Sequence, residues 1–356
     1  MSPDNKNEPI KITLEDLARV ESAVPAGTLA APTRGEGGAK VYGNVGEATD
    51  QRVESHEEHE RGNILLQAWF YLGVAGLIGA SLAWVIAEPA FIDRGEHRWG
   101  NLWMIPMVVT LQCVGFAIAE SLVERSAKKA LVQGLLALPL GVILAFVFDF
   151  AAEIIFQLGV SIAAGAGAQS FRNPAFWVAR GVAWMVFGAA GGVVYGIIGQ
   201  SSKKTLYGAL GGGLGAGIGG LIFDPIAMLS KGGATSRGVG FALLGMATGI
   251  AIGLVESALK DRWLYVTAGP LAGKQFILYK ARTLIGSDQK CDIYLFKDPA
   301  ILAEHAIVEI TGTRVQLRAL GPAYVSGQPA RLQVLQSGNS VQIGRYAFRY
   351  SERQRK

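Results

Sequence analysis

The sequence predicts a two-part fold: an α-helical, multi-pass membrane domain followed by an all-β sandwich. Three observations predict it. Half of the 356 residues are hydrophobic and only 17% are charged, against about 25% charged in an average soluble protein. The shortage of charge lies in the middle of the chain, which holds six long apolar runs. After the last run, short strand-like segments alternate with turn residues, which is typical of a sandwich or barrel.

Charge divides the chain into three parts. Residues 1–62 carry 7 basic and 12 acidic side chains, residues 63–263 carry 13 and 10, and residues 264–356 carry 13 and 6. The three net charges are therefore −5, +3 and +7, which sum to the +5 of the whole chain. We expect four regions: an acidic disordered segment at 1–62, a six-helix transmembrane domain at 63–260, a β-sandwich at 263–351 and a basic tail at 352–356.

The acidic segment is rich in Glu, Gly, Pro, Ser and Thr. It offers too little apolar surface to offset the entropy of ordering the chain, so we expect disorder. Thr13 and Asp16 could cap a short helix, either a docking segment or a frayed local turn. His56 and His59 stand three apart without an obvious third ligand, so we expect no metal there.

Six apolar runs reach the roughly 20 residues that a membrane-spanning helix needs. An even number of spans places both ends of the chain on the same side of the membrane. Basic residues gather in the loops near 124–129 and 203–204 and after the last span, and such loops mark the cytoplasmic side. We therefore expect a multi-pass protein of the inner (plasma) membrane with both termini cytoplasmic and a long outer loop near 150–175. The predicted spans are 64–87, 102–123, 130–148, 176–198, 205–223 and 238–259.

Offsets of 75 and 57 residues relate parts of the membrane region and predict three helical hairpin repeats. Within them, glycines recur every four positions, which places them on one face of each helix. Such faces let helix backbones approach closely in a membrane. Three uses stay open: packing within one chain, self-association into a homo-oligomer, and a pore or substrate path. The helix-packing glycines are Gly188, Gly192, Gly196, Gly211, Gly215, Gly219, Gly245, Gly249 and Gly253.

Ionisable residues in the spans are sparse and lie near the span ends. Deeply placed charges would indicate transport, and their scarcity favours an anchor. Asp149 and Asp224 end their helices on the outer side, where Arg180 and Arg237 begin the next ones. We expect two interfacial ion pairs, Asp149 with Arg180 and Asp224 with Arg237.

The basic region carries motifs at intervals typical of one domain family. Gly286 follows an apolar strand, His305 ends a four-residue motif that begins at Leu302, and Gly327 follows Ser326 in a turn. Together with the hairpins at 266–274 and 335–344, this pattern resembles the forkhead-associated (FHA) family. The resemblance covers residues 263–351 and implies an eleven-stranded β-sandwich.

FHA domains usually bind phosphothreonine peptides with loops at one end of the sandwich, and a phosphate dianion needs a cation and hydrogen-bond donors. In this sequence, Ser287 stands at the phosphate-binding Arg of the family, Leu302 at the Ser of Ser-x-x-His, and Ser326 at the peptide-gripping Asn. Lys290, on the same loop as Ser287, is a cation that could reach a phosphate. The resemblance assigns Gly286, His305 and Gly327 to the architecture of the fold.

Three uses of the domain follow: phosphothreonine binding, phosphate-independent protein binding, and a passive structural role. The +7 charge of its region favours acidic peptides or the anionic inner leaflet as partners. We therefore expect a cytoplasmic protein or (phospho)peptide and membrane lipid as partners, and no nucleic acid.

The sequence has no P-loop, nucleophile elbow or kinase signature, so we expect neither an enzyme nor a cofactor. Its two cysteines, Cys113 and Cys291, do not form a disulfide framework and suit a reducing compartment.

The main hypothesis is a non-catalytic, membrane-anchored adaptor or scaffold that presents the FHA-like domain and self-associates through its glycine-rich helices. The alternative is a channel or transporter subunit that the FHA-like domain regulates.

Overall fold

The structure is a computed structural model. It describes residues 33–34, 40–41, 63–92, 99–168, 172–229 and 233–353. The chain divides into two units, Met1–Glu60 and Arg61–Lys356. In the first unit, β1 (Thr33–Arg34) and β2 (Lys40–Val41) form an antiparallel pair. The helix predicted after Thr13 and the histidine pair at 56 and 59 lie outside the described residues.

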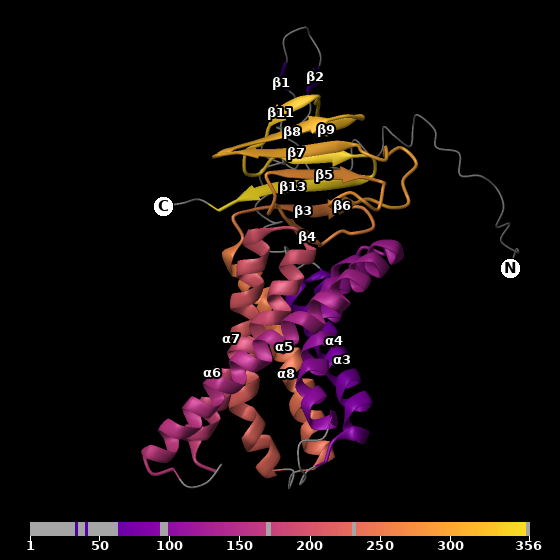
Figure 1. Cartoon of the computed structure of the whole chain (residues 1–356). Helices are drawn as coiled ribbons and strands as arrows, with labels where there is room; N and C mark the ends of the chain where they lie inside the picture. The colour runs from indigo at the N-terminus through magenta and orange to yellow at the C-terminus, as the bar shows by residue number, and fades with distance from the viewer. Residues whose placement is uncertain are drawn as a thin grey trace, which may run out of the picture. The chain divides into compact units, whose positions relative to one another are not determined.

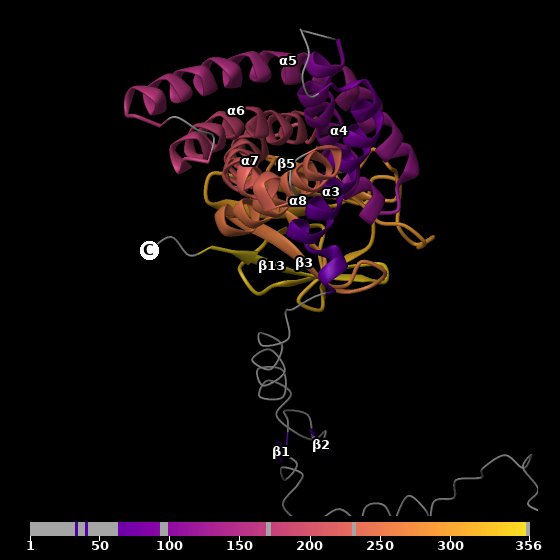
Figure 2. The same cartoon turned by 90° about the horizontal axis from the view of Figure 1, so that it is seen from below.

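The second unit begins with helices. Six helices in the described part of the chain are long and apolar enough to cross a membrane, as the sequence predicts. Each packs on its neighbour in the chain, and the last also packs on the first, so the six close into a bundle (Figures 1 and 2). They are α3 (Ala68–Ala87), α4 (Trp99–Val123), α5 (Ala127–Gly165), α6 (Pro174–Ile198), α7 (Ser202–Leu229) and α8 (Ala234–Leu259), with 3-10 turns η1 (Ile64–Leu66) and η2 (Glu88–Ala90) on either side of α3.

Helix α5 corrects one prediction. It has 39 residues, a length of about 58 Å at 1.5 Å per residue, or nearly twice the hydrocarbon core of a bilayer. The outer loop expected near 150–175 is therefore mostly helix. Apolar residues at four-residue spacing continue the exposed face of α5 well beyond Asp149, which explains why the helix does not end there. These residues are Phe150, Ile154, Leu158 and Ile162.

The nine predicted packing glycines lie at three contacts between helices: α6 with α7, α7 with α8, and α8 with α3. A Cβ atom at any of them would lie within 3.0 Å of a neighbouring helix, closer than real Cβ atoms come. The neighbours are Ala216 for Gly188, Gly208 for Gly192, Thr205 for Gly196, Ile252 for Gly211, Thr248 for Gly215, Leu244 for Gly219, Gly76 for Gly245, Leu72 for Gly249 and Trp69 for Gly253.

These glycine faces are covered by helices of the same chain, so a second copy has no access to them. The nine glycines therefore pack helices within one chain, and self-association of the protein stays a prediction. Their close backbone approach serves packing within one chain, which is how small residues stabilise helix contacts in lipid.

The two predicted ion pairs are also wrong in their partners. Arg180 Nε donates to Asp224 Oδ2 at 2.9 Å, and Arg237 pairs with Glu88. The antiparallel packing of α6 and α7 brings the start of one helix level with the end of the other. Because α8 packs on α3, the start of α8 likewise meets the turn that follows α3. The carboxylate of Asp149 is therefore not the partner of Arg180.

The chain passes from α8 into the β domain after only Lys260 and Asp261. Residues 262–352, which are fully described, form a sandwich of a six-stranded and a five-stranded sheet. The total of eleven strands agrees with the family resemblance. The strands are β3 (Arg262–Ala268), β4 (Gln275–Ile277), β5 (Arg282–Gly286), β6 (Ile293–Tyr294), β7 (Ala306–Thr311), β8 (Arg314–Ala319), β9 (Ala323–Val325), β10 (Gln328–Pro329), β11 (Leu332–Val334), β12 (Ser340–Ile343) and β13 (Tyr346–Glu352).

The sheets run in the order β10-β9-β12-β13-β3-β4 and β11-β8-β7-β5-β6. Between them lies one core, in which Tyr346, Phe348 and Tyr350 are the largest fully buried aromatic side chains. Strands β4 and β6 each end a sheet, and both contribute residues to a pocket that α4, α5 and α7 also line. The opposite edges are β10 and β11.

Candidate functional site

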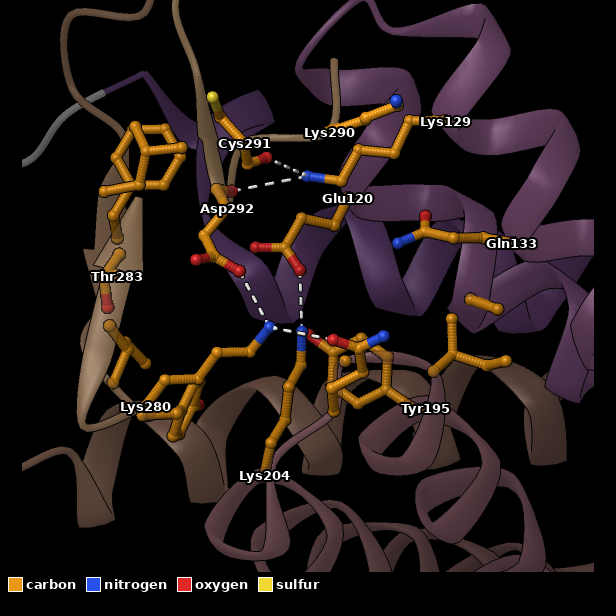
Figure 3. Close-up of a pocket in the computed structure, with 18 of the residues that line it drawn as sticks. Glu120, Lys129, Gln133, Tyr195, Lys204, Lys280, Thr283, Lys290, Cys291 and Asp292 are labelled. Atoms are coloured by element: carbon orange, nitrogen blue, oxygen red, sulfur yellow. Dashed lines mark hydrogen bonds and ion pairs between the residues drawn. The ribbon is translucent and has the colours of Figure 1, made fainter. Parts of the chain in front are cut away.

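A pocket of about 480 Å³ lies between the β domain and the helix ends nearest to it. We call it the junction pocket. It is lined by the start of α5 and α7, the end of α6, inward residues of α4 and α8, strand β4 and the loop between β5 and β6. Figure 3 shows lysine, carboxylate and tyrosine side chains converging on it.

Two lysine pairs begin the helices at the junction pocket. Lys128 and Lys129 lie in the first turn of α5, and Lys203 and Lys204 lie in the first turn of α7. Neither of these fully described turns contains an acidic residue. Because the N-terminus of a helix carries a partial positive charge, lysines there raise the local potential further. The sequence detected these pairs only as topology signals.

Carboxylates from α4 and the following turn meet this positive charge. Glu120 accepts from Lys204 Nζ at 2.7 Å. Glu124 accepts from Lys274 Nζ at 2.7 Å and from Lys129 Nζ at 3.1 Å. The side chains of Glu124 and Lys274 are each only 1% exposed. Losing one member of such a pair leaves an uncompensated buried charge, so the pair fixes the β domain on the helices.

A second link joins the two domains through Glu256 on α8. This carboxylate is 2% exposed and accepts from the hydroxyls of Tyr195 on α6, at 3.2 Å, and of Tyr279 in the β domain, at 2.8 Å. Burial, followed by the charge of Glu256, raises the pKa of Tyr279 well above its ordinary value of 10.0. The phenol therefore stays protonated and keeps its role as donor.

The loop between β5 and β6 completes the wall. Lys129 Nζ donates to the Asp292 carbonyl oxygen at 3.3 Å, and Lys280 Nζ donates to the Asp292 carboxylate at 2.7 Å. The other oxygen of that carboxylate accepts from the Leu284 N–H at 2.9 Å. Cys291 is buried here, and desolvation raises the pKa of its thiol to about 11. Its environment suits a packed, protonated thiol.

The four predicted peptide-binding residues do not all lie at the junction pocket. Lys290 lines the junction pocket, whereas Ser287, Leu302 and Ser326 do not. The Ser287 hydroxyl donates to the Ile301 carbonyl oxygen at 2.9 Å, so its hydrogen is used within the loop. Leu302 is 48% exposed. Lys290 is thus the one of the four that lines the junction pocket, and its reach to a phosphate held by the other three stays a prediction.

The structure shows why the fold needs the three residues that the resemblance assigns to its architecture. His305 is 1% exposed; its Nδ1 accepts from the Leu302 N–H at 3.1 Å and its Nε2 lies 3.0 Å from the Pro322 carbonyl oxygen. The ring therefore holds two loops together. A Cβ atom at Gly286 would overlap the carbonyl oxygen of Ala303.

The turn between β9 and β10 requires left-handed backbone. Ser326 has φ 49° and Gly327 has φ 80°, and they are the two central residues of the hairpin. Two consecutive positive φ values define a type I′ turn, which favours Asn-Gly or Gly-containing pairs. Ser326 is exposed at its tip.

Sequence reasoning missed the residues that join the two domains. Glu124, Lys274 and Tyr279 drew no attention, because each looks ordinary within its own segment. Glu124 and Lys274 are 150 residues apart. One signal was available: Lys274 is a basic residue in the otherwise apolar first hairpin of the β domain, and such a residue needs a partner.

The β domain is the part of the chain that is similar to known proteins. Residues 265–354, a quarter of the chain, match the family described as "Inner membrane component of T3SS, cytoplasmic domain". Over 86 residues the chain is 34% identical to an "Oxoglutarate dehydrogenase inhibitor" of Corynebacterium glutamicum, covering 23% of this chain and 59% of that protein. It is also 34% identical over 86 residues to the "Glycogen accumulation regulator GarA" of Mycolicibacterium smegmatis, covering 23% and 54%.

Solved structures with similarity to the chain include the FHA domain of the CT664 protein from Chlamydia trachomatis, at 26% identity and a TM-score of 0.25, covering 27% of this chain and 100% of that one. The cytoplasmic domain of the T3SS sorting platform protein PscD from P. aeruginosa has 25% identity and a TM-score of 0.24, covering 27% and 83%. The chain spans about three fifths of the length of the first curated relatives that it matches. The C-terminal domain thus matches this family of cytoplasmic domains in sequence and has the FHA-like, eleven-stranded sandwich that the sequence predicts.

Proposed function

We propose that this protein is a non-catalytic adaptor of the inner membrane that presents its FHA-type domain to a cytoplasmic protein in a fixed orientation. The observation that carries the proposal is the buried pair between Glu124 and Lys274. Together with a connection of only two residues after α8, it makes the β domain a rigid continuation of the bundle. A flexible tether would need no buried charge pair at this position.

The orientation of the chain is supported by its lysines. The pairs at 128–129 and 203–204 lie at the helix ends nearest the β domain, and basic residues beside spans favour the cytoplasmic side. A cysteine introduced by Leu332→Cys, on exposed β11, should react with a membrane-impermeant maleimide in inverted vesicles but not in right-side-out ones. The reverse pattern would place the domain outside.

The recognition surface is proposed to be the loop end that carries Ser287, Leu302 and Ser326. An exposed leucine stands where the family has a hydroxyl, and the Ser287 hydroxyl is already hydrogen-bonded to Ile301. Both features favour contact with a protein surface over the grip of a phosphate dianion, which needs charge-assisted donors. The match to a family of inner membrane components supports the same role.

The test is proximity crosslinking of the full-length protein in its own membranes. Leu302→Asp should reduce the captured partner at least tenfold, whereas phosphatase treatment should leave capture unchanged. Leu332→Asp is the matched control, because Leu332 is 61% exposed and lies on the opposite sheet edge. If Leu302→Asp and Leu332→Asp lost captured partner equally, the loop end would not be the recognition surface. If capture disappeared after dephosphorylation, the domain would recognise phosphothreonine.

A further inference from the structure

We propose that the junction pocket binds the phosphate-bearing headgroup of an anionic glycerophospholipid from the adjoining leaflet. The pocket has the volume for a headgroup, about 480 Å³, and it opens where helix ends meet the β domain. Four observations support this assignment: lysines and an acceptor that have no partner among the described residues, a positive helix end and a lipid-facing wall.

The first observation is a small surplus of cations, because five lysines and four carboxylates line the pocket. The pocket is lined by Lys204 and Lys280, each within 2.7 Å of a carboxylate, but also by Lys128 and Lys290. Among the described residues, no carboxylate lies within 4.0 Å of the Nζ atom of either Lys128 or Lys290. Figure 3 shows Lys290, of the β domain, on the same side of the pocket as Lys129, the chain neighbour of Lys128 on α5. A phosphate between them would receive a cation from each domain.

The second observation is the start of α5. Lys128 and Lys129 occupy its first turn, where the helix dipole is already positive. Placing cations there disfavours the helix unless negative charge is nearby. Glu124 meets part of this need but is shared with Lys274. A bound anion would supply the remainder.

The third observation distinguishes a lipid from a soluble anion. Val132 and Leu136 line the same pocket one and two turns further along α5, and they are 48% and 57% exposed. They belong to a membrane-spanning helix, so this wall faces acyl chains. A lipid can place its chains along these residues while its headgroup reaches Lys128 and Lys290, which matches the way basic residues beside spans attract anionic lipids.

The fourth observation concerns the headgroup itself. Gln289 lines the pocket, and its side-chain oxygen is buried with no hydrogen-bond donor within the described part of the chain. Buried acceptors nearly always have a donor. A glycerol hydroxyl beside the phosphate would provide one, which favours a glycerophosphate headgroup. Because Lys128 lies on a helix and Lys290 on the β domain, such a lipid would reinforce the docking of the domain.

Full-length protein in nanodiscs of phosphatidylcholine with a minority of phosphatidylglycerol tests the proposal, with bound lipid counted by native mass spectrometry. Wild type should retain phosphatidylglycerol in preference to phosphatidylcholine. The variant K128Q/K290Q should lose this retention by about fivefold per lysine, or roughly 25-fold in all. Neither lysine has a carboxylate partner among the described residues, so the unfolding temperature should not fall in nanodiscs of phosphatidylcholine alone, where no anionic lipid is bound.

The matched control is K297Q/R331Q, which removes two exposed charges of the β domain outside the pocket and should keep the preference. K128R/K290R should keep it too, because the charges remain. Undiminished retention in K128Q/K290Q, or an equal loss in K297Q/R331Q, would overturn the site. If soluble glycerol phosphate displaced the lipid at comparable concentration, the pocket would take a free phosphate ester and the assignment to a lipid would be wrong.

Discussion

Between α6 and α7 the closest contacts are made by backbone, where Gly192 meets Gly208 without a side chain between them. Between the helices and the β domain, the contacts are made by the ends of long side chains, as where Lys274 Nζ reaches Glu124 at 2.7 Å. The first contact depends on close packing of uncharged atoms. The second depends on a pair of buried charges, and such a pair is stable only while both charged partners are present.

The two regions therefore differ in what they tolerate. A helix contact at a glycine fails when an atom is added, because a neighbouring backbone already occupies the space. The junction fails when a charge is removed, because the remaining charge is buried alone. The same chain thus uses steric fit inside the bundle and electrostatics at its end.

The largest effect is expected from Gly192→Ala. Its methyl group would overlap the Gly208 carbonyl oxygen, and two helix backbones would have to separate. We expect a loss of at least about 3 kcal/mol in the free energy of unfolding, at the upper end of overpacking effects. Thermal and denaturant unfolding in detergent would measure it.

The matched control is Gly165→Ala at the end of α5, where nothing lies within 4 Å of an added Cβ atom. This change should be neutral or slightly stabilising, because alanine favours helix more than glycine does. If both alanine variants unfolded at the same temperature, close backbone approach would not be what holds α6 to α7.

The junction is tested by Lys274→Met. Among the described residues, it leaves Glu124 buried with Lys129 as its one remaining cationic partner, and we expect a loss of about 3 kcal/mol in the free energy of unfolding. The double variant Glu124→Gln/Lys274→Met should recover much of that loss, because it removes the stranded charge. Protease sensitivity near residues 259–262 would report undocking of the β domain.

Lys203→Met provides the contrast, because Lys203 is 58% exposed in its pair with Asp261. Exposed pairs contribute less than about 1 kcal/mol. A loss at Lys274 no larger than the loss at Lys203 would show that burial adds nothing at the junction.

The same contrast explains what the sequence could reveal. Membrane spans are predictable because their signal, about 20 apolar residues, is local. The β domain was recognisable because Gly286, His305 and Gly327 meet demands of the backbone and loops that few other residues satisfy. The length of α5 was missed because the charged Asp149 was interpreted as the end of a membrane span. The apolar residues that continue the exposed face of the helix after it were not interpreted as helix.

Partners of charged residues were the least predictable feature. Arg180 bonds Asp224, 44 residues away, because α6 and α7 pack antiparallel, and no spacing rule encodes which helices become neighbours. Glu124 and Lys274 are further apart still. The junction pocket therefore could not be foreseen, since it exists only once two domains meet.

A double-mutant cycle on Arg180→Gln and Asp224→Asn tests the corrected pairing. Polar pairs in membrane bundles couple weakly, and we expect about 1 kcal/mol between these two sites. Thermal unfolding of the wild type, the two single variants and the double variant would measure this coupling free energy. The parallel cycle with Asp149→Asn should show no coupling, and a larger coupling there would reinstate the pairing that sequence order suggested.

A small effect is also expected at a glycine of a different kind. Gly327 has φ 80°, but no atom lies within 4 Å of an added Cβ. Gly327→Ala should therefore cost only the strain of a left-handed residue, about 1 kcal/mol. Gly286→Ala, which meets the Ala303 carbonyl oxygen, should cost clearly more in the same unfolding assay. If Gly327→Ala proved as damaging as Gly192→Ala, backbone conformation would outweigh close packing as the reason for glycine in this chain.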